Sequence, residues 1–229
     1  MAQHQQVLAV DFGTSNSAVG ICRNGQAQIL EMEAGQQTLP TALFFDYEEK
    51  VVNFGSAAEQ ALFEGAWGRY MRALKSLLGT PLIRESSIFL GKRMSYIDIV
   101  AKFLAELKER AELASGVRYN RVLSGRPVRF HADSKRDAQA QTDLTECYEK
   151  AGFKQIHFMN EPEAAARAQA HVLSAGDLGL VIDIGGGTSD FTLFRSASNT
   201  EIEIIHSEGL CLGGTDFDRL LSFEHIMPL

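Results

Sequence analysis

The sequence predicts an α/β fold that contains an internal repeat. One pattern occurs twice: an apolar run of β-forming residues ends at an aspartate, passes through a turn of glycine and hydroxyl residues, and continues into a second apolar run. The first copy is VLAVDFGTSNSAVGIC, from Val7 to Cys22, and the second is LVIDIGGGTSDFTLF, from Leu180 to Phe194. Between the copies, segments with helical periodicity alternate with short strands. This order is typical of an α/β protein with two related halves.

The individual elements follow from apolar periodicity and from turn residues. Outside the second copy, we expect strands at about 7–11, 18–22, 27–31, 41–45, 121–124, 156–159 and 201–207. We expect helices at about 57–63, 69–78, 96–115, 134–151 and 160–174. The sequence Arg23-Asn24-Gly25 predicts a tight hairpin turn between the second and third strands. The segment Gly125-Arg126-Pro127 is expected to be a loop.

Two helices have the clearest signals. In 96–115, apolar residues such as Ile97, Val100 and Leu104 recur at spacings of three and four, which places them on one face. The helix that follows 156–159 begins with a capping residue, Asn160, and has a proline in its first turn. Its high alanine content favours close packing between layers.

The repeated turns have the chemistry of phosphate binding. Glycine allows close backbone approach, and successive N–H groups in such a turn can bind an anion. Hydroxyl side chains add donors: Thr14, Ser15 and Ser17 in the first turn, Thr188 and Ser189 in the second. Asp11 and Asp183 end the strands and could hold Mg²⁺ through water, since this ion prefers oxygen ligands. Alternatively, glycine and aspartate serve turn geometry alone. The repetition in matching context favours ligand binding, and two facing turns would form a nucleotide cleft.

Composition and charge limit the classes of partner that the chain is expected to bind. The chain has 229 residues, a net charge of −7 and a pI of about 5.4, with no basic stripe, which argues against nucleic acid and anionic membrane as partners. The apolar runs are strand-sized, and no signal peptide is evident, so we expect a cytoplasmic protein without a membrane partner. The three cysteines lie far apart, which excludes a zinc spacing and indicates reduced, buried thiols.

The repeat also predicts the domain organisation. The first lobe is expected to span residues 1–177, with a core of 1–45 and 116–177 and an inserted sublobe at about 46–115. Residues 178–229 form a truncated start of the second lobe, which lacks the helices and closing strands of the first. From the sequence alone we therefore expect a fragment, or a chain that another chain completes.

These motifs resemble the actin-like ATPase superfamily, and within it the 70-kDa heat-shock (DnaK-like) chaperone family. VDFGTSNSAVG and VIDIGGGTSDFTLF are similar to the family's two phosphate motifs, and NEPEAAARA to its connecting helix. GGTDFD resembles the segment after the second phosphate loop, and ALKSLLG the segment with the catalytic lysine. GRPVRF and the last residues further resemble the YegD-like branch. The resemblance implies an actin-like, duplicated ribonuclease H-like fold, of which this chain covers about the first half.

The resemblance also implies roles for single residues. Lys75 would meet the γ-phosphate, Glu161 would orient water, Thr188 would contact the γ-phosphate or the attacking water, and Asp190 would order the second hairpin. Asp11 and Asp183 would hold Mg²⁺ through water. Backbone contacts to the nucleotide would come from Gly13, Thr14, Ser15, Gly185, Gly186, Gly187, Gly213 and Gly214. From the residues alone, Lys75 could equally be a solvated lysine, and Glu161 an acid favoured at a helix N-terminus.

Several departures from the family pattern accompany this match. Glu163 stands where the family usually has a neutral residue, and Arg126-Pro127 replaces its Val-Pro. The inserted sublobe matches poorly outside Lys75, and the adenosine-binding motif belongs to the half not covered. Two other groups of the superfamily fit less well. Sugar kinases differ from this sequence at the first turn, and actin filament proteins differ at the start of the connecting helix.

The resemblance implies an Mg-ATP-binding protein that hydrolyses ATP slowly and uses lobe closure to act on client or co-chaperone proteins. ATP, ADP and Mg²⁺ are the expected ligands. Two alternatives remain open: a nucleotide-gated binding module without significant hydrolysis, and an incomplete fragment that binds nucleotide weakly.

Overall fold

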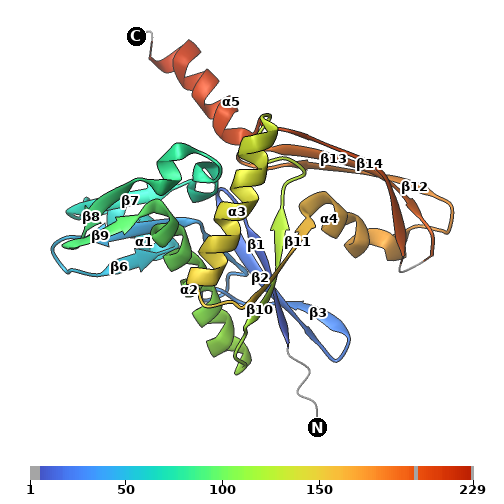
Figure 1. The fold of residues 1–229 in the computed structure, drawn as a ribbon, viewed down its shortest axis with the longest axis horizontal. Helices are drawn as coiled ribbons and strands as arrows, with labels where there is room; N and C mark the ends of the chain where they lie inside the picture. Colours follow the sequence, from blue (N-terminus) through green and yellow to red (C-terminus); the bar gives the residue numbers. More distant parts are fainter. Residues whose placement is uncertain (1–5, 199–200, 228–229) are drawn as a thin grey trace. The chain divides into compact units, whose positions relative to one another are not determined.

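The computed structural model describes residues 6–198 and 201–227 (Figure 1). Contacts divide the chain into two compact units. Unit 1 comprises Met1–Ser124 and Ala138–His157, and unit 2 comprises Gly125–Asp137 and Phe158–Leu229. By contacts, residues 158–177 thus group with the second hairpin. The predicted lobes were defined by the sequence repeat rather than by contacts, and their boundary at residue 177 stays a prediction.

Among the described residues, unit 1 contains a large mixed sheet, two smaller sheets and two complete α-helices. Its elements are β1 Val7–Phe12, β2 Asn16–Arg23, β3 Gln26–Ile29, β4 Thr38–Pro40, β5 Ala42–Asp46, β6 Val52–Phe54, α1 Ser56–Phe63, β7 Gly68–Arg72, the 3₁₀ turns η1 Leu74–Leu77 and η2 Pro81–Arg84, β8 Ser86–Phe89, β9 Lys92–Ser95 and α2 Tyr96–Ser115. Three further elements run from one unit into the other: β10 Arg121–Arg126, α3 Ser134–Lys150 and β11 Gln155–Asn160.

The large sheet has the strand order β11-β10-β1-β2-β3, and β4 pairs with β2. Strand β1 is parallel to β10 and antiparallel to β2, as a hairpin followed by a helical crossover requires. The predicted turn between β2 and β3 is confirmed, because Asn24 and Gly25 both have positive φ, at 54° and 78°. Two such residues form the turn that matches the twist of a hairpin.

Helices α2 and α3 cover one face of this sheet. Leu8, Val10 and Phe12 of β1 are 0–3% exposed. The Phe12 ring lies 6.0 Å from that of Phe103 on α2, and the Tyr148 hydroxyl of α3 lies 2.8 Å from the Ser124 hydroxyl of β10. Burial of these apolar side chains is the main stabilising contribution in unit 1.

Helix α2 has the bounds that its periodicity predicts. It begins at a capping box, in which the Asp98 N–H donates to Ser95 Oγ and Asp98 Oδ2 accepts from the Ser95 N–H. It ends at Gly116, whose φ of 72° suits glycine. The predicted helices 57–63 and 134–151 are also confirmed within one residue at each end.

The helix predicted at 69–78 is wrong. Residues Gly68–Arg72 form strand β7, and Leu74–Leu77 form a single 3₁₀ turn. Strand β7 pairs antiparallel with β5 in the order β6-β5-β7, where Phe45 opposes Arg69. The segment is rich in good helix formers, but pairing with a neighbouring buried strand overrides local propensity.

Unit 2 contains α4 Glu161–Gln169, the 3₁₀ turn η3 Ala170–Val172, strands β12 Leu178–Ile184, β13 Ser189–Ser196 and β14 Ile202–Leu210, α5 Gly214–Leu221 and a π-helical turn η4 Ser222–Ile226. The strands form an antiparallel sheet in the order β12-β13-β14. Helix α4 lies against all three strands, as Figure 1 shows.

Exposure alternates along β12. The apolar side chains on one face of this strand are 56–62% exposed: Leu178, Leu180, Ile182 and Ile184. Their spacing of two residues is that of a strand with one buried face, but this face is open. The apolar residues of α5 are also open to solvent, with Leu220 at 57%.

Several other predictions need adjustment. Helix α4 ends at Gln169, before the predicted Ser174, and β10 includes Gly125 and Arg126, which were expected in a loop. Of the three cysteines, all unpaired, only Cys147 is buried, whereas Cys22 and Cys211 are exposed. In the part of the chain that the structure describes, no helix has both the length and the apolar character to cross a membrane.

Candidate functional site

The first glycine turn, in unit 1, is tight. Strands β1 and β2 pair up to Phe12 opposite Ser17, which leaves Gly13, Thr14, Ser15 and Asn16 to connect them. A Cβ atom at Gly13 would overlap the backbone carbonyl oxygen of Asn16. Only glycine therefore fits this position, as a turn whose backbone approaches a ligand would require.

The side chains of this turn differ in access to solvent. Asp11 and Ser15 are exposed and Thr14 is half-buried. Ser17 is 1% exposed, and its hydroxyl lies 2.8 Å from that of Thr41. The interpretation of Ser17 as a ligand-facing donor is therefore wrong, because its hydroxyl is committed to the core. The Thr41 N–H donates to the Ser15 carbonyl at 2.8 Å, so Thr41 supports the turn, a role that nothing in its own sequence context indicated.

Lys75 lies in unit 1 on the 3₁₀ turn η1. Its side chain is half-buried. Leu74 and Leu78 on either side are 0% and 1% exposed, and they anchor the turn in the core. Ala73, directly before η1, has a φ of 53°, which is a left-handed conformation that non-glycine residues rarely adopt. The position of Lys75 is thus fixed by its neighbours rather than by a regular helix.

The second glycine turn, in unit 2, is built against the start of α5. The Gly185 N–H donates to the Thr188 carbonyl at 2.8 Å and closes the turn. The N–H groups of Gly214 and Thr215 donate to the carbonyls of Gly185 and Gly186 at 3.0 and 2.9 Å. These bonds join the predicted Gly213-Gly214 segment to the glycine turn.

Gly213 has no room for a side chain at this junction. A Cβ atom there would lie 2.6 Å from the Gly187 nitrogen and from the Gly186 carbonyl carbon. The Thr215 hydroxyl also donates to the Gly186 carbonyl. Because the Gly214 and Thr215 N–H groups are bonded to the turn, they support its shape and are not donors for a ligand. The role of Thr215 was not predicted from the sequence.

Asp190 connects the second hairpin to the loop that follows β10. It is 1% exposed, and its Oδ1 accepts from the Val128 N–H at 2.9 Å. Asp183 opposes Asp190 across the hairpin and is half-buried, as is Thr188. The ordering role expected for Asp190 thus has a defined partner, the Val128 backbone.

Glu161 is the first residue of α4 and is half-buried. A Cβ atom at Gly125 would lie 3.1 Å from Glu161 Cγ, so glycine at 125 leaves space for this side chain. Asn160 precedes the helix but makes no side-chain capping bond. Glu163 pairs with Arg167 one turn later, at 2.9 Å, which compensates the extra negative charge that departs from the family pattern.

The predicted residues thus fall into two groups. Unit 1 holds Asp11, Gly13, Thr14, Ser15 and Lys75. Unit 2 holds Glu161, Asp183, Gly185, Gly186, Gly187, Thr188, Gly213 and Gly214. Among residues 6–198 and 201–227, no three His, Cys, Asp or Glu side chains gather into a metal-binding group.

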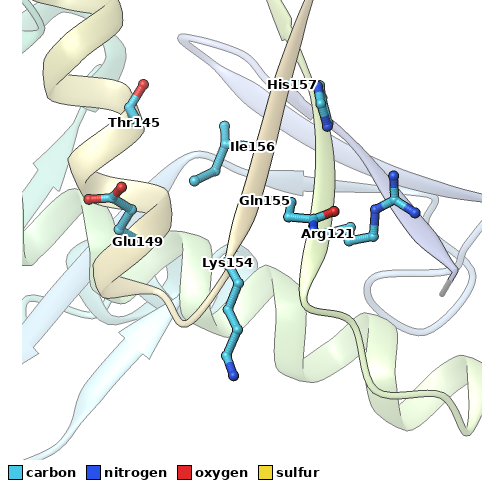
Figure 2. Close-up of a pocket in the computed structure, with 7 residues that line it drawn as sticks. All are labelled: Arg121, Thr145, Glu149, Lys154, Gln155, Ile156 and His157. Atoms are coloured by element: carbon cyan, nitrogen blue, oxygen red, sulfur yellow. The ribbon is translucent and has the colours of Figure 1, made fainter.

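A separate hollow of about 630 Å³ lies in unit 1 beside β11, and none of the predicted residues line it. Its lining residues are Arg121, Thr145, Glu149, Lys154, Gln155, Ile156 and His157. Figure 2 shows Thr145 and Glu149 on α3, well separated in the view from Arg121. The side chains do not converge, so this open hollow has no cluster of catalytic groups.

Comparison with known proteins identifies the family. A family model described as Hsp70 protein matches residues 7–228. The chain is 31% identical over 217 residues to the chaperone protein DnaK of Ureaplasma urealyticum serovar 10, an alignment that covers 94% of this chain and 34% of the relative. The same values hold for the chaperone protein DnaK of Ureaplasma parvum serovar 3. The chain therefore belongs to the Hsp70 family.

The chain spans about a third of the length of the curated relatives it matches. Its mixed α/β content and its family are consistent with an actin-like ATPase fold.

Proposed function

We propose that this chain provides part of an Mg-ATP site in a slow, chaperone-like ATPase. The observation that carries the proposal is that each unit has a glycine turn after a strand whose second-last residue is an aspartate, Asp11 in β1 and Asp183 in β12. Turns of this kind can present backbone N–H groups to phosphate. Membership of the Hsp70 family supports the assignment of ATP and ADP as the ligands.

The magnesium ion fits the donor chemistry of these turns. Asp11 is exposed and Asp183 is half-buried, so both carboxylates can reach a hydrated ion. We assign them to Mg²⁺ through water, since the ion takes oxygen ligands and usually keeps several waters. Bound there, Mg²⁺ would neutralise phosphate charge.

The chain's own residues would bind and orient the phosphates. Backbone N–H groups of Gly13, Thr14, Ser15, Gly186 and Gly187 are assigned to phosphate oxygens. Gly185, Gly213 and Gly214 support the second turn instead, because their N–H groups already donate to Thr188, Asp216 and Gly185. Thr188 would contact the γ-phosphate or hold the attacking water, and Glu161 would orient water. Lys75 would meet the γ-phosphate. Phosphoryl transfer depends mainly on such positioning and charge compensation.

Finer assignments belong to the same proposal. We infer a duplicated ribonuclease H-like fold with a lobe boundary at residue 177, membership of the YegD-like branch, and closure of the lobes on nucleotide. We also infer a cytoplasmic location and client or co-chaperone proteins as partners. They rest on the resemblance of the motifs quoted above.

A single-turnover hydrolysis assay on the full-length protein tests the proposal. Lys75→Ala should lower the rate of hydrolysis about a hundredfold, as loss of one charge-stabilising donor does in other enzymes. Lys92→Ala is the matched control, because Lys92 is an exposed lysine of unit 1 on β9. An unchanged rate in Lys75→Ala would remove the role of the lysine. ATP binding with no hydrolysis above background would favour a nucleotide-gated binding module instead.

A further inference from the structure

The segment around Lys75 is held by backbone geometry at both ends. Ala73 precedes η1 with a φ of 53°, and Gly79 follows it with a φ of 72°. The Thr80 N–H and hydroxyl both donate to the Leu77 carbonyl, at 3.1 and 2.7 Å. These features form a compact loop in which a shift of the residues after η1 would move Lys75.

A buried carboxylate on α3 fixes the C-terminal end of this loop. Asp143 is completely buried, and its Oδ2 accepts from the Gly79 N–H at 2.9 Å. Its Oδ1 accepts from Gln139 Nε2 at 2.8 Å and from the guanidinium of Arg84, which lies at the end of η2. One carboxylate thus joins the backbone after Lys75, the next 3₁₀ turn and helix α3, all within unit 1.

This arrangement exceeds what stability alone would require. A buried ion pair is often no more stabilising than well-packed apolar residues of similar size, because both charges lose hydration. A carboxylate instead imposes direction, since each oxygen accepts bonds only from donors placed correctly. Arg84 is half-exposed and also pairs with Glu146, so solvent and a second carboxylate can satisfy it. The Gly79 N–H is buried and depends on Asp143 as its acceptor.

We propose that Asp143 is a positioning residue that sets the location of Lys75 through the Gly79 backbone. The inference rests on the proposed function, because it assumes that Lys75 acts on the γ-phosphate. In this proposal Asp143 acts only on the position of the lysine. Its effect on hydrolysis is therefore transmitted entirely by the lysine.

Steady-state ATP hydrolysis by the full-length protein gives the first measurement. Asp143→Ala removes the acceptor for Gly79 and should lower kcat about tenfold or more, because small displacements of a catalytic group are costly. The KM for ATP should stay within about twofold, since the phosphate-binding turns are untouched. Asp143→Asn keeps a carbonyl acceptor for the Gly79 N–H and should restore most of kcat.

A double-mutant cycle separates positioning from general destabilisation. In a Lys75→Ala background, Asp143→Ala should cause no further loss of kcat, since the residue through which it acts is gone. Equal losses in both backgrounds would overturn the inference. If Asp143→Ala does not fold, Arg84→Gln replaces it in the cycle. Arg84 lies at the surface, and its substitution removes one of the partners that hold the Asp143 carboxylate.

The outcomes distinguish the two proposals. If Lys75→Ala leaves kcat unchanged, the proposed role of the lysine fails, and the inference fails with it. If Lys75→Ala lowers kcat but neither Asp143→Ala nor Arg84→Gln does, only the positioning inference is overturned.

Discussion

Corresponding residues of the two hairpins differ sharply in burial. Leu8 and Val10, which lie three residues and one residue before Asp11, are 0% and 3% exposed. Leu180 and Ile182, at the same distances before Asp183, are 59% and 56% exposed. Both hairpins nevertheless have the same antiparallel pairing around a glycine turn.

The helices account for this difference. In unit 1, α2 and α3 pack on the face that Leu8 and Val10 share, as the Phe12–Phe103 contact shows. In unit 2, β13 buries its Thr192 and Phe194 side, which carries Val181 and Gly179 of β12 rather than the leucines. The turn is therefore a property of local sequence, whereas burial of the strand depends on what covers each face. A repeated motif does not imply a repeated core.

The largest expected effect comes from one substitution made in both hairpins. Leu8→Ala should lower the free energy of unfolding by about 2 to 5 kcal/mol, because it removes buried methyl groups and leaves a cavity. Leu180→Ala should cost less than about 0.5 kcal/mol, because an exposed side chain has little contact to lose. Urea unfolding of both variants measures the difference. Equal losses would show that the β12 leucines are covered in solution.

A second comparison concerns the carboxylate that holds the second hairpin. Asp190→Ala should lower the free energy of unfolding by about 1 to 3 kcal/mol, because the partly buried Val128 N–H loses its acceptor. Asp190→Asn retains an acceptor of the same shape and is the control. If thermal unfolding finds the two variants equally destabilised, the Val128 bond is not the cause.

The helix starts of the two units give a smaller effect. Ser95→Ala should cost about 1 kcal/mol, because Ser95 caps α2 with its hydroxyl. Asn160→Ala at the start of α4 should cost less, since Asn160 makes no side-chain capping bond. Circular dichroism during urea unfolding measures both, and a larger loss in Asn160→Ala would reverse the assignment.

The smallest expected effect is a pH dependence within unit 1. A hydrogen bond from Lys150 of α3, at 2.9 Å, lowers the pKa of Asp98 below its ordinary value of 3.8. Because the folded state favours the charged form, this contribution is fully present above pH 3.8 and is lost as the pH falls through the folded pKa. The stability difference between wild type and Asp98→Asn should therefore shrink in acid. A difference that is constant with pH would exclude the ion pair as its source.

Much of the fold could be predicted from the sequence where local signals and packing agree. The bounds of α2 follow from its apolar spacing and its caps, and the β2–β3 turn follows from Asn24-Gly25. The 69–78 segment could not be predicted, because its strand exists only through pairing with β5. The exposure of Leu180 was equally hidden, since alternation predicts two faces of a strand but not what covers them.

The candidate site was predictable to a similar degree. Glycine at 13 and 213 was recognisable from its motif, and the structure gives the reason in the lack of space for a Cβ atom. Thr41, Thr215 and Asp143 support these segments through contacts between residues far apart in sequence. No local pattern marks such residues, so only the structure could find them.

The central claim of the proposed function is that each glycine turn binds phosphate groups of Mg-ATP. Amide hydrogen exchange, followed by mass spectrometry with and without Mg-ATP, tests it most directly. The account predicts slower exchange on nucleotide addition in both turns, at residues 13–15 and 186–188. Protection of one turn alone, or of neither at saturating nucleotide, would contradict it.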